Sequence, residues 1–203
     1  MYVSTHFSKL HDIDRIDEEY EKTYLYWKEH IYRYLPKDPE TSFLDLGCGL
    51  GHKMYALKKL GYKNVKAIDI SPECVEFCRR KGFDVEEADI LEFLEKSNTD
   101  YQVIYAFDVL EHFDRDEALQ IVSIARSTLS KLGLLLLFLP NANNLSNFRL
   151  RYMDITHEAF YTPESIAQLL LSGGFENIKI VGLRHFSLND KRKLRILFKG
   201  FVA

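Results

Sequence analysis

The chain has 203 residues, of which 46% are hydrophobic and 28% are charged. This length and composition suit one soluble α/β domain with a sizeable buried core and leave no room for a second independent domain. The formal net charge is -3 and the sequence pI is about 6.2, which gives the chain no general attraction for nucleic acid or for an anionic membrane. We therefore expect no nucleic-acid partner.

The cysteine content indicates a reducing compartment. The chain has three cysteines, Cys48, Cys74 and Cys78, which form no disulfide framework for this length. The longest apolar run, residues 134–139, is too short to span a bilayer, and no apolar leader follows the N-terminus. These features predict a cytoplasmic protein.

The pattern of apolar residues predicts helices and strands in alternation. The first helix is expected over residues 20–35, ending at Pro36. The expected strands cover residues 42–46, 64–70, 83–88, 101–107, 132–139 and 175–183. The later helices are expected over residues 51–60, 73–81, 115–129 and 162–173.

This alternation indicates the fold class. The strand at 132–139 is so apolar that both of its faces must be buried, which is typical of parallel sheets covered by helices. We predict an α/β fold, Rossmann-like and doubly wound, in which a mostly parallel sheet has helices on both faces. An N-terminal helical cap at 1–40 precedes the sheet domain at 41–203 within one compact domain. Ligands of such sheets bind at the C-terminal ends of the strands.

The loop after the first predicted strand reads Asp45-Leu46-Gly47-Cys48-Gly49-Leu50-Gly51. Glycines allow the backbone to turn tightly and to approach a ligand. Dinucleotide sites use the spacing G-x-G-x-x-G, whereas this loop has G-x-G-x-G with an acidic residue two positions before the first glycine. The loop resembles motif I of class I S-adenosylmethionine (SAM)-dependent methyltransferases. Asp45 suits their donor, which carries an ammonium and a sulfonium instead of phosphates.

The resemblance implies further donor-binding residues at the ends of the next strands. Asp69, followed by Ile70, matches the residue that accepts hydrogen bonds from both ribose hydroxyls. Asp89 matches the position that takes the adenine amino group, with Ile90 beside the base. Each residue also has a purely structural interpretation: Gly51 allows tight packing, and the two aspartates cap the helices that follow them.

The resemblance extends over residues 42–183, and two segments are similar to narrower groups of methyltransferases. Residues 107–113 look like the segment after strand four of many small-molecule and lipid O-methyltransferases, in which Phe107 and Asp108 would line the donor site. Residues 151–162 and 27–30 are similar to methyltransferases encoded beside glycosyltransferases in bacterial polysaccharide clusters. The long loop is itself an indication of function.

Two histidines in predicted loops are candidates for the catalytic base, since imidazole titrates near neutral pH. We favour His157 over His112, with Asp154 or Glu158 available to orient it. Arg151 is expected to bind an anionic part of the substrate, and Tyr152 and Glu158 complete the predicted substrate-binding set. The structural alternative is that Thr156 and His157 cap the following helix and that His112 begins a helix and fills space.

A metal site is an alternative interpretation of the same region. Asp108, Glu111, His112 and His157 offer two carboxylates and two imidazoles around one point. The pattern D-x-x-E-H resembles the metal-binding segment of plant small-RNA 2′-O-methyltransferases. We do not favour this alternative from sequence, because the Glu-His pair is common in methyltransferases without a metal.

The sequence therefore predicts a SAM-dependent O-methyltransferase that acts on a small molecule or a sugar hydroxyl, in polysaccharide biosynthesis. A nucleic-acid methyltransferase is disfavoured because the Asn/Asp-Pro-Pro-aromatic motif is missing after strand four. The glycine spacing disfavours a dehydrogenase. The remaining alternative is a SAM-binding protein without turnover that acts as a partner or regulator.

The C-terminal segment has two open interpretations. A seventh strand is expected over residues 194–202, unless the chain stops before forming it. The segment is basic and amphipathic, and we interpret it as a solvated edge of the domain. Peripheral membrane contact is the alternative. Its basic residues are Lys191, Arg192, Lys193, Arg195 and Lys199.

Overall fold

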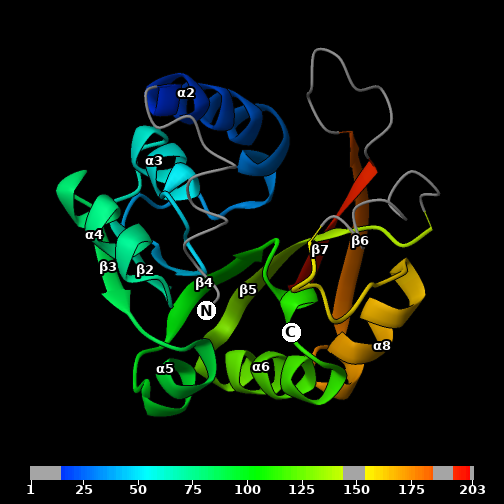
Figure 1. Ribbon diagram of the computed structural model, residues 1–203. Helices are drawn as coiled ribbons and strands as arrows, with labels where there is room; N and C mark the ends of the chain where they lie inside the picture. Colours follow the sequence, from blue (N-terminus) through cyan, green and yellow to red (C-terminus); the bar gives the residue numbers. More distant parts are fainter. Residues whose placement is uncertain (1–14, 144–153, 185–193, 202–203) are drawn as a thin grey trace. The chain divides into compact units, whose positions relative to one another are not determined.

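The computed structural model describes residues 15–143, 154–184 and 194–201. The chain forms two compact units, Met1–Asp89 and Ile90–Ala203, whose elements are labelled in Figure 1. The predicted division into a helical cap and a sheet domain stays a prediction.

The first unit contains parallel strands in the order β3-β2-β1. They are β1 (Ser42–Leu46), β2 (Asn64–Asp69) and β3 (Asp84–Glu87), each within one residue of the predicted bounds. The apolar residues of β1 and β2 form the centre of this unit. Leu44, Leu46, Ala67 and Ile68 are almost completely buried. The bounds of the three strands and the burial of their apolar residues confirm the predicted strands.

Helices of the first unit begin and end at the residues that the sequence signals. Helix α3 (His52–Lys59) starts after Gly51, and α4 (Pro72–Arg80) has Pro72 in its first turn. The Ser71 side chain caps α4 by accepting a hydrogen bond from the Cys74 amide at 3.2 Å. These helix predictions are confirmed.

The N-terminal helical segment begins earlier than predicted. Helix α2 (Ile16–Tyr26) continues as a π-helical turn, η2 (Trp27–Ile31), and a 3-10 turn, η3 (Tyr32–Tyr34). The acidic first turn stabilises the earlier start through the helix dipole. Ile16 at one end and Trp27 and Ile31 at the other are buried, so the segment is fixed by packing along its whole length.

The second unit contains β4 (Tyr101–Phe107), β5 (Leu129–Pro140), β6 (Asn177–Arg184) and β7 (Leu194–Phe201) in the order β4-β5-β7-β6. Strands β4 and β5 are parallel, whereas β7 runs antiparallel to both β5 and β6. The seventh strand is therefore present. Residues 133–140 of β5 are all buried, which confirms the prediction for this apolar run.

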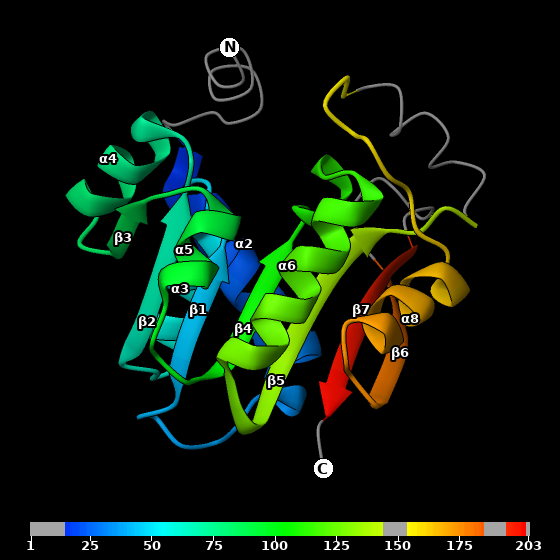
Figure 2. The same cartoon turned by 90° about the horizontal axis from the view of Figure 1, so that it is seen from below.

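Helices of the second unit lie in a row in Figure 2: α5 (Ile90–Lys96), α6 (Arg115–Thr128) and α8 (Pro163–Ser172). Capping boxes begin α6 at Asp114 and α8 at Thr162. The end of α8 approaches α6 closely, because a Cβ at Gly173 would lie 2.5 Å from Val122 Cγ1. Helix α5 was missing from the predicted order of elements.

Within the described ranges of the chain, no helix has the length and apolar content needed to cross a membrane.

Two glycines with nearly the same backbone conformation allow a matched test of the packing of the first unit. Gly51 and Gly82 have φ of 78° and 76°, but a Cβ at Gly51 would lie 2.9 Å from the Phe83 ring, whereas none of the described atoms lies within 4 Å of one at Gly82. We expect Gly82→Ala to lower the free energy of unfolding by about 1–2 kcal/mol, the cost of a left-handed alanine. Gly51→Ala should cost about 1–3 kcal/mol more through overpacking.

Urea denaturation of the two variants measures this difference. Equal losses in the two proteins would show that Phe83 does not restrict position 51.

Candidate functional site

The glycine loop that follows β1 is held by the end of β2. The amides of Gly47 and Cys48 both donate to the Ile68 carbonyl, at 3.0 and 3.1 Å. Gly47, Gly49 and Gly51 have φ of 75°, 54° and 78°, in the left-handed region that favours glycine. The three predicted glycines are therefore required by the backbone of this turn.

The glycines differ in what surrounds them. In the described part of the chain no atom lies within 4 Å of a Cβ built at Gly49, so this position faces open space. Gly51 instead lies against the Phe83 ring and the Cys78 sulfur, as the structural interpretation of this residue requires. Gly49 is thus the point at which a ligand can approach the backbone of the loop.

Asp69 joins the glycine loop to the loop after β2. Its Oδ2 accepts a hydrogen bond from the Gly49 amide at 2.7 Å, and its Oδ1 accepts one from the Ser71 amide at 2.9 Å. The carboxylate is only half-buried, and the neighbouring Ile70 side chain is 57% exposed. Asp69 therefore places negative charge and Ile70 an apolar surface beside the open side of the loop.

The other acidic residues of the predicted donor site differ in exposure. Asp45 is fully buried in β1. A hydrogen bond with Cys78, burial and the charge of Asp45 together raise the pKa of the Cys48 thiol. Cys48 is therefore a neutral, buried side chain within the loop. Asp89 is half-buried and ends the first unit, directly before α5. Ile90, the first residue of α5, is buried.

Helix α2 supports the glycine loop, a role that was not predicted. The Tyr20 hydroxyl donates to the Leu50 carbonyl at 2.6 Å, and its ring stacks on Tyr55 of α3. Burial raises the pKa of Tyr20, which keeps this donor protonated. Tyr20 is the first residue of the predicted N-terminal helix, but its partner Leu50 lies 30 positions away along the chain, so no local signal in the sequence indicates this contact.

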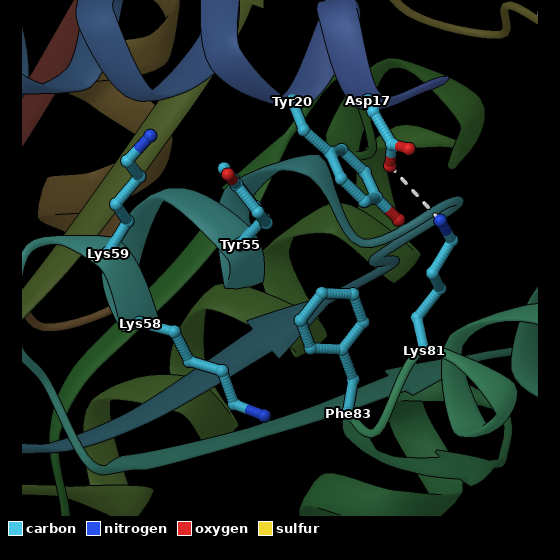
Figure 3. Close-up of a pocket in the computed structure, with 7 residues that line it drawn as sticks. All are labelled: Asp17, Tyr20, Tyr55, Lys58, Lys59, Lys81 and Phe83. Atoms are coloured by element: carbon cyan, nitrogen blue, oxygen red, sulfur yellow. Dashed lines mark hydrogen bonds and ion pairs between the residues drawn. The ribbon is translucent and has the colours of Figure 1, made fainter. Parts of the chain in front are cut away.

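A cavity of about 510 Å³ lies among the helices of the first unit but contains none of the predicted donor-binding residues (Figure 3). Its lysines already have partners: Lys81 pairs with Asp17 at 3.1 Å, Lys58 donates to the Gly82 carbonyl, and Lys59 pairs with Glu21. These ion pairs hold α2 against its neighbours. We assign the cavity no ligand.

The segment after β4 begins in a strained conformation. Asp108 has φ of 55°, and its amide donates to the Phe138 carbonyl at 2.9 Å. The Phe107 ring stacks on Phe138, with ring centroids 5.0 Å apart. Positive φ at a residue other than glycine is uncommon and often occurs at functional sites. Both predicted donor-lining residues of this segment are therefore held by β5.

A second cluster forms where the 3-10 turn η4 (Leu110–His112) meets the turn at 154–157. The glutamate and the two histidines each offer one ligand atom, and these atoms all lie within 4.8 Å of one another. Amides of Glu158 and Ala159 donate to the Glu111 carbonyl at 2.9 and 3.1 Å and fix the two turns together. The cluster consists of Glu111, His112 and His157.

Asp154 contacts both histidines of this cluster, one of them through Thr156. The Thr156 hydroxyl donates to Asp154 Oδ1 at 2.6 Å and lies 2.9 Å from His112 Nδ1. His157 Nε2 lies 3.8 Å from Asp154 Oδ2. Of the two predicted candidates for an orienting carboxylate, Asp154 is therefore the one that lies at the cluster. The other candidate for that role, Glu158, is exposed to solvent.

The capping interpretation of this region is wrong. No helix begins at Thr156 or His157 in the described chain; the next described helix, α8, is capped by Thr162. His112 ends a 3-10 turn and does not begin a helix. Three of the four residues in the predicted metal set come together, and Asp108 is outside the group. Arg151 and Tyr152 lie outside the described residues.

Comparison with known proteins assigns the family. Residues 19–180 match the model of the methyltransferase domain family. The chain belongs to this family and is a class I SAM-dependent methyltransferase. Its fold is therefore the Rossmann-like fold predicted from the alternation of strands and helices.

Solved structures with a similar fold cover nearly the whole chain. A SAM-dependent methyltransferase from Archaeoglobus fulgidus is 20% identical, has a TM-score of 0.75, and matches over 94% of this chain and 100% of its own. Magnesium protoporphyrin IX methyltransferase from Synechocystis, solved with bound SAM, is 18% identical with a TM-score of 0.65, over 93% and 82% of the two chains. At these identities the likeness shows the fold alone.

One curated relative is more similar in sequence but over a shorter region. The mitochondrial ubiquinone biosynthesis O-methyltransferase of Saccharomyces cerevisiae is 33% identical over 93 residues. This region is 43% of the present chain and 30% of the relative. The chain thus matches less than a third of that enzyme's length.

Removal of the Tyr20 hydroxyl tests its support of the glycine loop. Tyr20→Phe leaves the buried Leu50 without this donor, and we expect it to lower the free energy of unfolding by about 1–2 kcal/mol. Urea denaturation measures the loss. The matched control is Tyr24→Phe on the same helix. Among the described residues, Tyr24 contacts Lys28 and Lys59 through its ring, which phenylalanine keeps. Equal effects would contradict a specific role for the Tyr20 hydroxyl.

Proposed function

We propose that the chain transfers a methyl group from SAM to a hydroxyl oxygen of a small molecule or a sugar. The observation that carries this proposal is the pair of imidazoles beside Asp154, because a hydroxyl acceptor must lose a proton and imidazole is suited to remove one near neutral pH. The donor, when bound, supplies a methyl group on a sulfonium, a good leaving group.

The glycine loop and the acidic residues of the first unit fit SAM as the methyl donor. Gly49 offers open space at the loop backbone, which a Cβ would partly fill, and the Asp69 carboxylate lies beside it. Both oxygens of Asp69 already accept amide hydrogens, so the carboxylate is held in place before a ligand arrives. We propose that Asp69 binds the ribose hydroxyls, that Asp89 binds the adenine amino group, and that Asp45 favours a cationic ligand.

Further donor contacts follow from the same resemblance. We propose that Ile70 and Ile90 contact the adenine, and that Phe107 and Asp108 line the methionine end. The exposure of Ile70 supports the first contact, since a bound base would cover this apolar side chain. The strained backbone at Asp108 supports the contact with the methionine end of the donor, because such strain persists only where neighbouring structure enforces it.

We propose that the hydroxyl group of the acceptor loses its proton to a residue of the cluster in the second unit. His157 has Asp154 beside its Nε2, while its Nδ1 is buried and lacks a hydrogen-bond partner among the described residues. A neutral imidazole has one ring nitrogen with a lone pair that can accept a proton. As the hydroxyl oxygen forms its bond to the methyl carbon, the bond from carbon to sulfur breaks and the proton passes to the imidazole of His157.

The acceptor class rests on two resemblances. The segments at 27–30 and 151–162 are similar to methyltransferases of polysaccharide clusters, which supports a glycan or glycan precursor made in the cytoplasm, with Arg151, Tyr152 and Glu158 binding it. The yeast relative is named an O-methyltransferase. A nitrogen acceptor is the second candidate, because a structural neighbour from Thermotoga maritima is described as a possible histamine N-methyltransferase.

Substitution of His157 tests the proposed chemistry. We expect His157→Gln to lower kcat by about 10²- to 10⁴-fold, the usual contribution of a general base, while affinity for S-adenosylhomocysteine stays unchanged. The assay follows transfer of ¹³C-labelled methyl to sugar and lipid-linked glycan acceptors, and the carbon chemical shift of the product distinguishes O-methyl from N-methyl.

The matched control is His30→Gln, a half-buried histidine of η2 that also lies near a carboxylate, 3.7 Å from Glu29. Full activity of His157→Gln would contradict the proposed base. Tight donor binding with no transfer to any acceptor would instead favour the SAM-binding protein without turnover.

A further inference from the structure

We infer that Glu111, His112 and His157 form a binding site for a divalent transition-metal ion. Binding of the ion is independent of methyl transfer, but its catalytic role rests on the proposed function. The three residues offer one carboxylate and two imidazoles, a donor set typical of zinc, cobalt and iron sites that keep coordination positions open for other ligands.

The spacing of the three side chains suits one ion. One ligand atom from each residue lies within 4.8 Å of the others. In a tetrahedral site with bonds of about 2.1 Å from zinc to nitrogen or oxygen, the ligand atoms would be roughly 3.4 Å apart. Coordination of one ion therefore requires the side chains to shorten their widest separation by up to about 1.4 Å.

Hydrogen bonds orient His112 for coordination. The single hydroxyl hydrogen of Thr156 is directed to Asp154 Oδ1, at 2.6 Å. The Thr156 oxygen can then only accept a hydrogen from His112 Nδ1, at 2.9 Å. This assigns the ring proton of His112 to Nδ1 and leaves the lone pair on Nε2, the nitrogen that would coordinate the ion.

His157 lies beside the same carboxylate, at a distance longer than a hydrogen bond. Its Nε2 is 3.8 Å from Asp154 Oδ2, and its Nδ1 is buried with no hydrogen-bond partner in the described part of the chain. The centroids of the two histidine rings are 4.7 Å apart in a T-shaped arrangement. Histidines that ligate metals usually donate their second ring N–H to a carboxylate or another oxygen. His112 does so through Thr156, and Asp154 lies close enough to His157 to take this place after a small movement of the ring.

The surroundings of Glu111 add a further polar group at the cluster. Glu111 is 1% exposed, and buried carboxylates in proteins are paired, hydrogen-bonded or coordinated to metals. The Tyr161 hydroxyl is buried and lacks a hydrogen-bond partner among the residues described. An ion bound by the cluster would neutralise part of the charge of the buried Glu111 carboxylate.

The donor atoms determine which ions should bind. Imidazole nitrogen suits zinc, cobalt and iron, whereas magnesium prefers an octahedron of oxygen ligands. We therefore expect Co²⁺ and Zn²⁺ to bind more tightly than Mg²⁺. A cation here would bind the acceptor hydroxyl and lower its pKa, so that its proton passes to water. His157 would then act as a ligand, and its role as the base would belong to the metal-free protein.

Co²⁺ titration of the whole chain, stripped of metal with a chelator, tests the inference. We expect the visible absorption of a cobalt complex with imidazole ligands, and competition by Zn²⁺. His112→Ala, His157→Ala and Glu111→Gln should each abolish this signal. Thr156→Val should lower Co²⁺ affinity about 10- to 100-fold, as outer-sphere changes usually do, whereas Thr156→Ser, which keeps the hydroxyl, should restore it.

The matched control is His52→Ala, because this histidine also faces a carboxylate, with Nε2 3.1 Å from Glu19 Oε2, but lies outside the cluster. Absence of the absorption in the unchanged protein, or its persistence in both cluster histidine variants, would overturn the inference. Thermal unfolding and binding of S-adenosylhomocysteine are measured for every variant. No Co²⁺ signal together with intact donor binding and His157-dependent activity would reject the metal site while leaving the proposed function in place.

Discussion

The glycine loop depends on one constraint, which is that its backbone must turn sharply at the end of β1 while its amides remain hydrogen-bonded to the neighbouring strand. The Ile68 carbonyl accepts from two successive amides of the loop, and Asp69 accepts from a third at Gly49. This arrangement requires left-handed φ at alternate positions, which explains the spacing of the glycines. The same bonds hold the Asp69 carboxylate beside the open position.

The surrounding elements of the first unit keep that loop in place. Tyr20 of α2 contributes a hydroxyl to the Leu50 carbonyl, and Phe83 next to β3 fills the space left by the missing side chain at Gly51. Helix α2 thus has a structural function at the glycine loop. Exposed ion pairs between α2 and its neighbours, including that of Lys81 with Asp17, add little to this contact because solvent screens them.

The second unit uses hydrogen bonds to orient side chains. Asp154 orients His112 through Thr156, which assigns the ring proton of His112 to Nδ1, and it lies 3.8 Å from His157 Nε2. The carbonyl of Glu111 holds the turn that carries these groups. A general base and a metal ligand both use the lone pair of an imidazole nitrogen, so both require the ring to be held in one orientation.

The sequence predicted most of the elements and the turn of the glycine loop because their signals are local. Glycine spacing, the Ser71-Pro72 cap and the apolar run of β5 each act within a few residues, and the structure agrees with them. Thr156 and Tyr20 were missed as functional residues, since their partners lie 44 and 30 positions away and are set by tertiary packing. Helix α5 was missed because its seven residues are too few to show a clear period.

The most direct test of this account is calorimetric titration with SAM, S-adenosylhomocysteine and NADH, for the unchanged chain, Asp69→Asn and Asp84→Asn. Asp84 is the matched control, an exposed aspartate at the start of β3. The account predicts that both adenosyl ligands bind, that NADH does not, and that only Asp69→Asn weakens binding, by roughly tenfold or more, the loss of one charge-assisted hydrogen bond. Binding of NADH alone, or equal effects of the two substitutions, would contradict it.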